Sequence, residues 1–469
     1  MEPNVSRRRV LKTASALGVA GLAGCTSGDS GDGGTETPTD EPTDEPTDGG
    51  GQQEGDSVTI GVLQPLSGSL AYYGQQSLWG LFSGLAYKGD TDPIGEAQSG
   101  TYTATVGDVD YDLVIRDTEL SADKAQSLAT DLVQNEEVDL LAGITSSGAA
   151  NRVIKNVAKP SGTPIVVGPA ASATITSSSE TCGENVFRAN ENTAMDARSG
   201  GRYVAQETDV NSVYLIGADY SFGHAVVDNY RAILEAEGVE IVGEKFVPRG
   251  YSEFEGILDE AQGAGAEGFV GGFTAKTLPA LITTFLNGEY DMRMFGGFAT
   301  EITTSIVGQT LQKALGEDFT AEDVDEQQFG PFTTRYHWNQ YDNEINDAFV
   351  DMHTSAYGKV PDLFSSGQFA AASAIVQAVE EGGSTDGADI AAAMRGMTVA
   401  DTPKGQDAYT FQEYNNQARS EMTIADPIPT EDEWADLWGA AIQPSEPVAR
   451  VGADQVTIPA DSEDIDCSL

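Results

Sequence analysis

The sequence predicts an α/β protein with two lobes, each built on a mostly parallel β-sheet flanked by helices. Short apolar segments rich in β-branched residues alternate with helical patterns, which is typical of parallel sheets covered on both faces. About 410 residues follow the N-terminal polar stretch, enough for two domains with hydrophobic cores. The alternation breaks near residues 187–193 and then restarts, so we expect a lobe boundary there.

The first lobe is expected to begin with a strand at residues 58–63 and the loop "PLSGSLAYYGQQ" at residues 65–76, before a helix. Ser121 stands where the N-cap of the next helix belongs. Further strands of this lobe are expected at residues 111–118, 138–143 and 164–170, and helices at 121–136 and 148–159. Strands of the second lobe are expected at residues 212–217, 239–246 and 268–272.

Residues 1–25 have the pattern of an export signal. "SRRRVLK" matches a twin-arginine signal, and the apolar segment after it is too short and too rich in glycine and alanine to span a membrane. The segment ends in "LAGC", which resembles a lipobox, so we expect Cys25 to carry a lipid. The alternative is an ordinary signal that ends by chance at a cysteine.

Residues 26–56 are expected to form a disordered acidic tether. They contain ten acidic residues, no basic residue and no large apolar residue, so they cannot bury a core. A flexible segment of this length spans roughly 30 Å. A lipidated cysteine, a tether and a folded body together describe a protein anchored to the outer face of a cell membrane.

The charge of the chain is strongly acidic. It has 74 acidic and 25 basic residues and a formal net charge of −49. This balance argues against binding to nucleic acid or to anionic lipid. At molar salt the Debye length falls to about 3 Å, which screens the self-repulsion of such a chain. The composition resembles that of proteins from salt-loving archaea, and an acidic secreted protein from a mesophile is the alternative.

Three loops that follow strands, at residues 65–74, 143–148 and 168–172, are small and polar. In open α/β sheets, ligands bind beyond the carboxyl ends of the strands. Backbone N–H groups at helix starts and the hydroxyls of Ser146, Ser147 and Ser172 would hold a carboxylate or another small electron-rich group there. Each serine alone is also explained as a helix cap.

The sequence offers no catalytic residue, metal site or cofactor motif. Its three histidines, His224, His337 and His353, do not have the spacing of a metal site or a catalytic triad. No cysteine pair has zinc spacing, "GFVGGF" lacks the dinucleotide fingerprint, and there is no P-loop. We therefore expect no enzyme activity and no cofactor, and any use of ATP would belong to a partner.

Six segments together resemble a known family: "VTIGVLQPLSGSLAYYGQQSLWG", "DLLAGITSSGAANRV", "PIVVGPAAS", "FRANENTAMDARSGGRYVA", "YLIGADYSFG" and "TPKGQDAYTFQEYNNQA". In order and spacing they are similar to type I periplasmic binding proteins of the leucine/isoleucine/valine-binding branch, from about Val58 to about Gln417. The resemblance implies a fold whose ligand cleft lies between the lobes. It also implies delivery of a small solute to the permease and ATPase subunits of an ABC transporter.

The resemblance also implies where the chain crosses between the lobes, namely near residues 192, 332 and 417. One lobe would then contain residues 57–192 and 333–416. The other would contain residues 193–332 and 417–469. A receptor that feeds a membrane signalling partner could use the same fold, and this is the alternative function. A monomer is expected in either case.

Eight pocket positions follow from the resemblance. Tyr73 would close over the ligand, Ser146 would bind its carboxylate, and Ala170 and Ser172 would complete that grip. Thr193 stands where an aspartate is common in relatives. Phenylalanines stand where tyrosines are common, at Phe222, Phe273 and Phe369, and suggest an apolar or planar ligand body, with core packing as the alternative for each.

The ligand class stays open at this point. A branched-chain amino acid, an amide or urea-like compound, and a small carboxylate all agree with these residues. An acid that would pair with a ligand amino group is hard to place, although Glu301 lies in a nearby segment. An ammonium group buried without such an acid would be costly.

Cys182 and Cys467 are expected to form a disulfide. They are the only cysteines that remain if Cys25 is lipidated, and an exported location permits oxidation. Their surroundings also resemble positions at which relatives carry a cysteine. Two unpaired thiols are the alternative.

Overall fold

A computed structural model describes residues 56–469 except 69–70, 96–97, 275 and 298–299. The chain divides into two units, residues 1–53 and 54–469. The predicted signal, Cys25 and the tether up to residue 55 lie outside the described residues. Within the described part, no helix combines the length and the apolar character that a membrane span needs.

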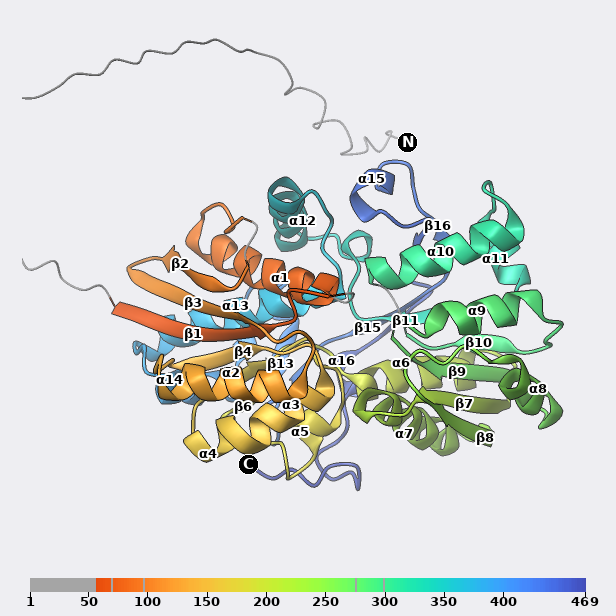
Figure 1. The fold of residues 1–469 in the computed structure, drawn as a ribbon, viewed down its shortest axis with the longest axis horizontal. Helices are drawn as coiled ribbons and strands as arrows, with labels where there is room; N and C mark the ends of the chain where they lie inside the picture. Colours follow the sequence, from red (N-terminus) through yellow and green to blue (C-terminus); the bar gives the residue numbers. More distant parts are fainter. Residues whose placement is uncertain (1–55, 69–70, 96–97, 275, 298–299) are drawn as a thin grey trace, which may run out of the picture. The chain divides into compact units, whose positions relative to one another are not determined.

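The first sheet has six strands in the order β2-β3-β1-β4-β5-β6. All neighbours are parallel except β2 and β3, which are antiparallel. Figure 1 shows these strands in colours from red-orange (β1) to yellow (β6). They are β1 (Asp56–Gln64), β2 (Gly100–Val106), β3 (Val109–Asp117), β4 (Leu140–Gly143), β5 (Ile165–Val167) and β6 (Val186–Arg188).

Helices cover both faces of this sheet, as the sequence predicts. One core contains side chains from β1, α1 (Ala71–Gly89), α13 (Leu363–Gly382) and α14 (Gly387–Met394). The other contains side chains from α2 (Ala122–Gln134), α3 (Ser147–Val153) and the π-helical turn Ile154–Ala158. Ser121 caps α2 as predicted, because its Oγ accepts a hydrogen bond from Lys124 N at 3.3 Å.

Glycines in α1 let α13 return to the first sheet from far along the chain. A Cβ on Gly80 would lie 2.1 Å from the carbonyl oxygen of Ser365, and one on Gly84 would lie 2.7 Å from the Cβ of Ala372. The two helices therefore pack with their backbones in close contact. This packing places the start of α13 beside the start of α1.

The second sheet is fully parallel, in the order β10-β9-β7-β8. One core joins it to α6 (Thr193–Glu207) and α7 (Ser221–Ala236), and another joins it to α8 (Glu255–Gly263), α9 (Leu278–Asn287) and α10 (Glu301–Leu315). Figure 1 shows this second group of elements in green. Its strands are β7 (Ser212–Ala218), β8 (Glu240–Val247), β9 (Gly268–Gly272) and β10 (Arg293–Phe295).

The chain passes between the two sheets at three places. Residues 188–193 lead from β6 into α6, and Arg188 forms a parallel bridge with Gln417. β11 (Phe332–Thr334) pairs with β15 (Met422–Ala425), which also pairs with β18 (Ala449–Val451), all antiparallel. Figure 1 shows β11 and β15 running between the two groups of strands.

The smaller elements complete the described fold. They are α4 (Lys159–Ser161), α5 (Thr174–Ser177), α11 (Ala321–Glu326), α12 (Glu344–Tyr357), α15 (Ala435–Trp438), α16 (Ala453–Val456), the 3-10 turn Trp338–Gln340, β12 (Thr398–Val399), β13 (Tyr409–Phe411), β14 (Ala418–Arg419), β16 (Pro427–Pro429) and β17 (Ile442–Pro444).

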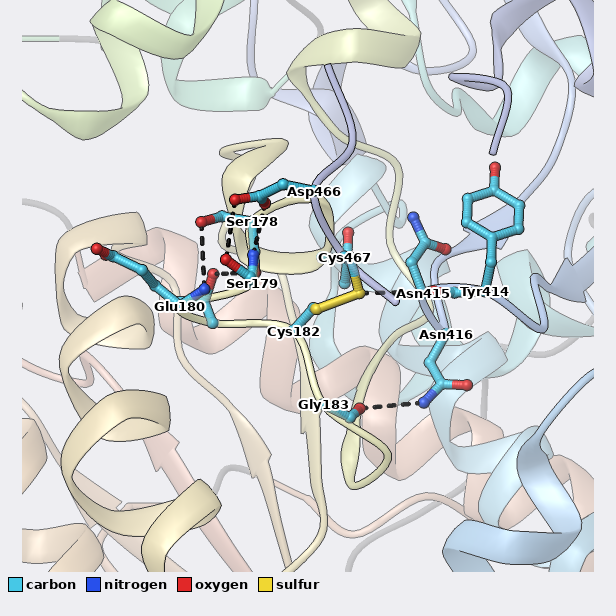
Figure 2. The surroundings of a disulfide bond; sticks show 12 residues. Ser178, Ser179, Glu180, Cys182, Gly183, Tyr414, Asn415, Asn416, Asp466 and Cys467 are labelled. Carbon is cyan, nitrogen blue, oxygen red and sulfur yellow. Dashed lines mark hydrogen bonds between the residues drawn. A yellow bond between two sulfur atoms is a disulfide. The ribbon is translucent and has the colours of Figure 1, made fainter. Parts of the chain in front are cut away.

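The structure contains the predicted disulfide between Cys182 and Cys467, with their Cα atoms 6.0 Å apart. The bridge joins the C-terminal segment to the turn between α5 and β6. Figure 2 shows Asp466 beside it, where the carboxylate accepts hydrogen bonds from Ser179 N at 2.6 Å and Ser179 Oγ at 2.8 Å. These contacts hold the end of the chain against the first lobe.

Candidate functional site

A cavity of about 320 Å³ lies between the two sheets. Its wall is formed by residues that follow the carboxyl ends of β4, β5, β7, β8 and β9, together with the first turns of α1, α10 and α13 and residues of the connecting segments. The sequence predicts a site at these strand ends, and the structure places a cavity there. A volume of this size corresponds to about ten water molecules, which is room for a small metabolite.

Serines after β4 form the polar part of the wall on the first sheet. Ser146 lines the cavity at the N-cap of α3, and its side chain makes no capping hydrogen bond. Ser147 also lines the cavity, but its Oγ accepts a hydrogen bond from Ser172 N at 3.1 Å. The Ser146 hydroxyl thus has both its donor and its acceptor sites open to a ligand, whereas Ser147 Oγ already accepts one hydrogen bond and keeps its O–H to donate.

Tyr73 lines the cavity, but as part of a helix. α1 begins at Ala71, so the loop is shorter than the sequence predicts and both tyrosines lie in the first helical turn. The Tyr73 ring packs edge-on against Phe364 of α13, with centroids 4.7 Å apart. Tyr72 does not line the cavity, and its hydroxyl donates to Asp362 Oδ2 at 2.5 Å.

Four of the eight predicted pocket residues do not line this cavity. Three of these four were predicted at polar positions of the pocket. Ser172 is fully buried, with its Oγ 2.8 Å from Thr174 Oγ1. Ala170 is equally buried, and its carbonyl oxygen accepts from the Arg188 guanidinium at 3.1 Å. Thr193 Oγ1 accepts from Ala173 N at 3.0 Å. These groups hold the loops behind the wall together.

Phe369 is the fourth, and it belongs to the core. It is fully buried in α13 and packs against Tyr87 and Phe349, with ring centroids 5.4 and 4.8 Å away. Phe222 and Phe273 do line the cavity, although Phe273 also packs against Phe254 in the second core. Phe369 is therefore a core residue, which was the alternative given for each phenylalanine. Phe222 and Phe273 form part of the apolar wall of the cavity.

Sequence reasoning missed an ion pair in the cavity wall. Asp196, in the first turn of α6, accepts a hydrogen bond from Arg335 Nε at 2.9 Å and a second from the Nη2 group. Burial alone would lower the pKa of Arg335, but the adjacent Asp196 carboxylate raises it above its usual value. A lone arginine in the apolar segment "PFTTRYHW" was the available signal.

Two further basic residues of the wall were also missed. Arg249 follows β8, and its guanidinium lies 3.6 Å above the ring centroid of Tyr220. Lys276 follows β9. Glu301, considered as a partner for a ligand amino group, does not line the cavity, and its Oε1 accepts from Lys359 Nζ at 2.9 Å.

Asp362 lies next to the cavity at the N-cap of α13, and burial raises the pKa of its carboxyl group to about 7. The unfolded chain has a pKa of about 3.9 at this group, so the folded protein binds more protons between about pH 4 and pH 7. We therefore expect Asp362 to make the free energy of unfolding fall as the pH rises through this window. In Asp362→Asn the free energy of unfolding should decrease less with rising pH than in wild type. Unfolding curves recorded at pH 4.5, 5.5 and 6.5 measure this difference. An unchanged slope would contradict the assignment.

The fold and the cavity define a two-lobed solute-binding protein. The family model for periplasmic binding proteins matches residues 57–429, and the chain therefore belongs to this family. It is a solute-binding protein and not an enzyme. The described residues contain no group of three or more His, Cys, Asp or Glu side chains that could hold a metal ion.

Relatives and solved structures agree with the family. A Leu/Ile/Val-binding protein homolog from Brucella abortus (strain 2308) is 27% identical over 359 residues, covering 75% of this chain and 83% of the relative. A branched-chain amino acid ABC transporter protein from Rhodopseudomonas palustris has a TM-score of 0.67 at 23% identity, covering 86% and 98% of the two chains. Another R. palustris solute-binding protein, in complex with benzoate, has a TM-score of 0.65 at 21% identity, covering 88% and 100%. The fold is that of type I periplasmic binding proteins.

Substitutions at Ser146 and Ser172 test which hydroxyl binds the polar end of the ligand. A hydrogen bond from a hydroxyl to a charged group contributes about 1.5–3 kcal/mol, so Ser146→Ala should weaken binding roughly tenfold or more. Ser172→Ala should bind nearly as wild type does, because its hydroxyl lies behind the wall. Calorimetric titration of both variants measures these ligand affinities. A loss of affinity confined to Ser172→Ala would show that the register assigned to these loops is wrong.

Proposed function

We propose that this solute-binding protein delivers to its ABC transporter a small carboxylate with an apolar body and no amino group. The observation that carries this proposal is the charge of the cavity wall. Among the described lining residues, Asp196 is the only acid, and Arg335 engages both of its carboxylate oxygens. Among those described residues no second acid stands ready to pair with an α-ammonium, and leaving such a group unpaired is costly.

The apolar part of the cavity supports a ligand with a flat or branched body. Tyr73 and Phe364 form one aromatic pair on the side of the first sheet, and Tyr220 and Phe222 form another on the side of the second, with centroids 6.1 Å apart. Aromatic side chains bury large areas and pack well against planar groups. The benzoate complex from R. palustris is one case of a planar carboxylate bound by a protein of this fold.

Matched ligand pairs test the absence of an amino group. We expect 4-methylpentanoate to bind more tightly than leucine, and 3-phenylpropanoate more tightly than phenylalanine, in calorimetric titrations at molar salt. Each pair differs only in the α-ammonium group. Tighter binding of both amino acids would overturn the proposed ligand class while leaving the family unchanged.

Capture would depend on closure of two lobes around the ligand. In our proposal, one lobe contains residues 57–192 and 333–416 and the other contains residues 193–332 and 417–469. A ligand that contacts both walls binds the closed state more tightly and so shifts the population towards it. The two solved R. palustris structures are described as ABC transporter proteins, so the sensing role is not favoured.

We also propose that the protein is exported by the twin-arginine route and works as a monomer anchored to the outer face of the membrane through a lipid on Cys25. The supporting features are "SRRRVLK", "LAGC" and the acidic tether, and the acidic composition supports a high-salt habitat. Cys25→Ser, expressed in a host with lipoprotein processing, should move from the membrane fraction to the medium. Retention of the variant at the membrane would contradict the anchor.

A further inference from the structure

Two basic side chains on the second-sheet wall have no acidic partner among the residues that the structure describes. Arg249 and Lys276 both line the cavity, and neither makes an ion pair or a side-chain hydrogen bond with the described residues. Acids outnumber bases 74 to 25 in this chain, so partners for a basic group are plentiful. Arg335, the third base of the wall, does have one in Asp196. The described wall therefore has an excess of positive charge.

The loops that carry these two bases are held together. Gly250 N donates to Thr277 Oγ1 at 3.0 Å, which ties the loop after β8 to the loop after β9. A Cβ on Gly250 would lie 3.2 Å from Lys276 Cε, and Gly250 has a φ of +81°. The Lys276 side chain therefore lies beside Gly250, the residue that follows Arg249 in the chain. Like charges held in one place repel unless an anion lies between them.

The guanidinium of Arg249 also lies over an aromatic ring of the cavity wall. Its Cζ is 3.6 Å from the centroid of the Tyr220 ring, within the range of a cation–π interaction. A planar guanidinium suits a carboxylate, which it can bind through two parallel hydrogen bonds. Lys276 would add a point charge to the same anion. The acidic surface elsewhere repels anions, so this local positive potential would also select them.

We propose that Arg249 and Lys276 form a second anion subsite, on the opposite wall from Ser146, and that the preferred cargo is an apolar or aromatic dicarboxylate. One carboxylate contacts the Ser146 hydroxyl on the first-sheet side. The other contacts Arg249 and Lys276 on the second-sheet side. A ligand with a charge at each end contacts both lobes and favours closure. This inference rests on the proposed function, which assigns a carboxylate ligand to the same cavity.

The test compares monocarboxylates with dicarboxylates of the same body. Benzoate is titrated against benzene-1,4-dicarboxylate and benzene-1,3-dicarboxylate, and hexanoate against hexanedioate, at fixed molar salt. Wild type should bind at least one dicarboxylate about tenfold or more tightly than its monocarboxylate. Arg249→Gln and Lys276→Gln should each lower dicarboxylate affinity by more than monocarboxylate affinity, and so remove most of that preference.

Lys245→Gln is the matched control. Lys245 is an exposed residue of β8 that does not line the cavity, and the substitution removes the same charge. It should bind both ligand series as wild type does. Equal affinity for mono- and dicarboxylates, or equal losses for both series in Arg249→Gln, would overturn the second subsite while the carboxylate assignment stands. Failure of every amine-free carboxylate to bind would overturn the proposed function itself.

Discussion

Replacing Lys404 by methionine is expected to lower the free energy of unfolding by about 3–5 kcal/mol, because it leaves a buried carboxylate without its counter-ion. Lys404 Nζ lies 2.7 Å from Glu191 Oε1, and the two side chains are 0% and 1% exposed. Glu191 Oε1 also accepts from Tyr409 Oη at 2.5 Å and from Ser420 Oγ at 2.9 Å. These hydrogen bonds would remain, but they do not neutralise the charge.

The double variant Glu191→Leu with Lys404→Met separates the ion pair from the packing around it. A buried pair replaced as a whole by apolar residues is often nearly neutral in stability, so the double variant should recover most of the loss. The measurement is the midpoint of guanidinium-induced unfolding at equal ionic strength. A single variant within about 1 kcal/mol of wild type would show that Glu191 takes up a proton or water when Lys404 is absent.

The location of this pair connects it with ligand capture. Glu191 lies in the segment that leads from β6 to α6, and Ser420 lies in the segment that leads from β14 to β15. Both segments run between the sheets, so the Glu191–Ser420 hydrogen bond joins two of the three connections, and Lys404 contacts both of its members. If the lobes move relative to each other on binding, the Lys404→Met variant should alter ligand affinity as well as stability.

The strands were predictable because burial on both faces imposes a continuous apolar pattern. The strand at residues 58–63 is observed as β1, and the strand at residues 268–272 is observed with the same limits as β9. The start of α1 was predicted too late, because the sequence pattern extended the loop to residue 76 whereas the helix already begins at Ala71. Local patterns thus locate elements better than they locate their ends.

The site was predicted less completely than the fold because hydroxyl and ring orientation depends on distant neighbours. Ser146 and Ser172 look equivalent in sequence, yet Ser172 is buried beside Thr174 while Ser146 lines the cavity. Phe364 and Phe369 lie on the same helix, but only Phe364 lines the cavity. Their helical positions differ by five residues, which places them on different faces.

The charged part of the wall could not be predicted from spacing. Asp196 and Arg335 are 139 residues apart, and their pairing appears only after the chain has crossed between the sheets. The same holds for Arg249 and Lys276, because a missing partner is a property of the folded surroundings and not of the local sequence. The resemblance to relatives places loops, but it does not assign charges that those relatives need not share.

Removing the disulfide is expected to lower the free energy of unfolding by about 4 kcal/mol or more in the chain-entropy model, since the bridge joins residues 285 positions apart. The variant is Cys182→Ala with Cys467→Ala, compared with wild type by guanidinium unfolding without reductant. Loss of the bridge should also release the C-terminal segment from Ser177, whose carbonyl oxygen accepts from the backbone N–H groups of Asp466 and Cys467 at 3.1 Å.

The control for this variant is Asp466→Asn, which weakens the contacts beside the bridge and keeps the bridge itself. The pKa of Asp466 is lowered by hydrogen bonds from the Ser179 backbone and side chain, so the ionised carboxylate is the form that binds there. Asp466→Asn should therefore shift the unfolding midpoint much less than the double cysteine variant does. Equal shifts would mean that the segment's polar contacts stabilise the fold and the covalent link does not. Two cysteines that react with a thiol reagent in denatured, unreduced protein would show that the bridge is not formed at all.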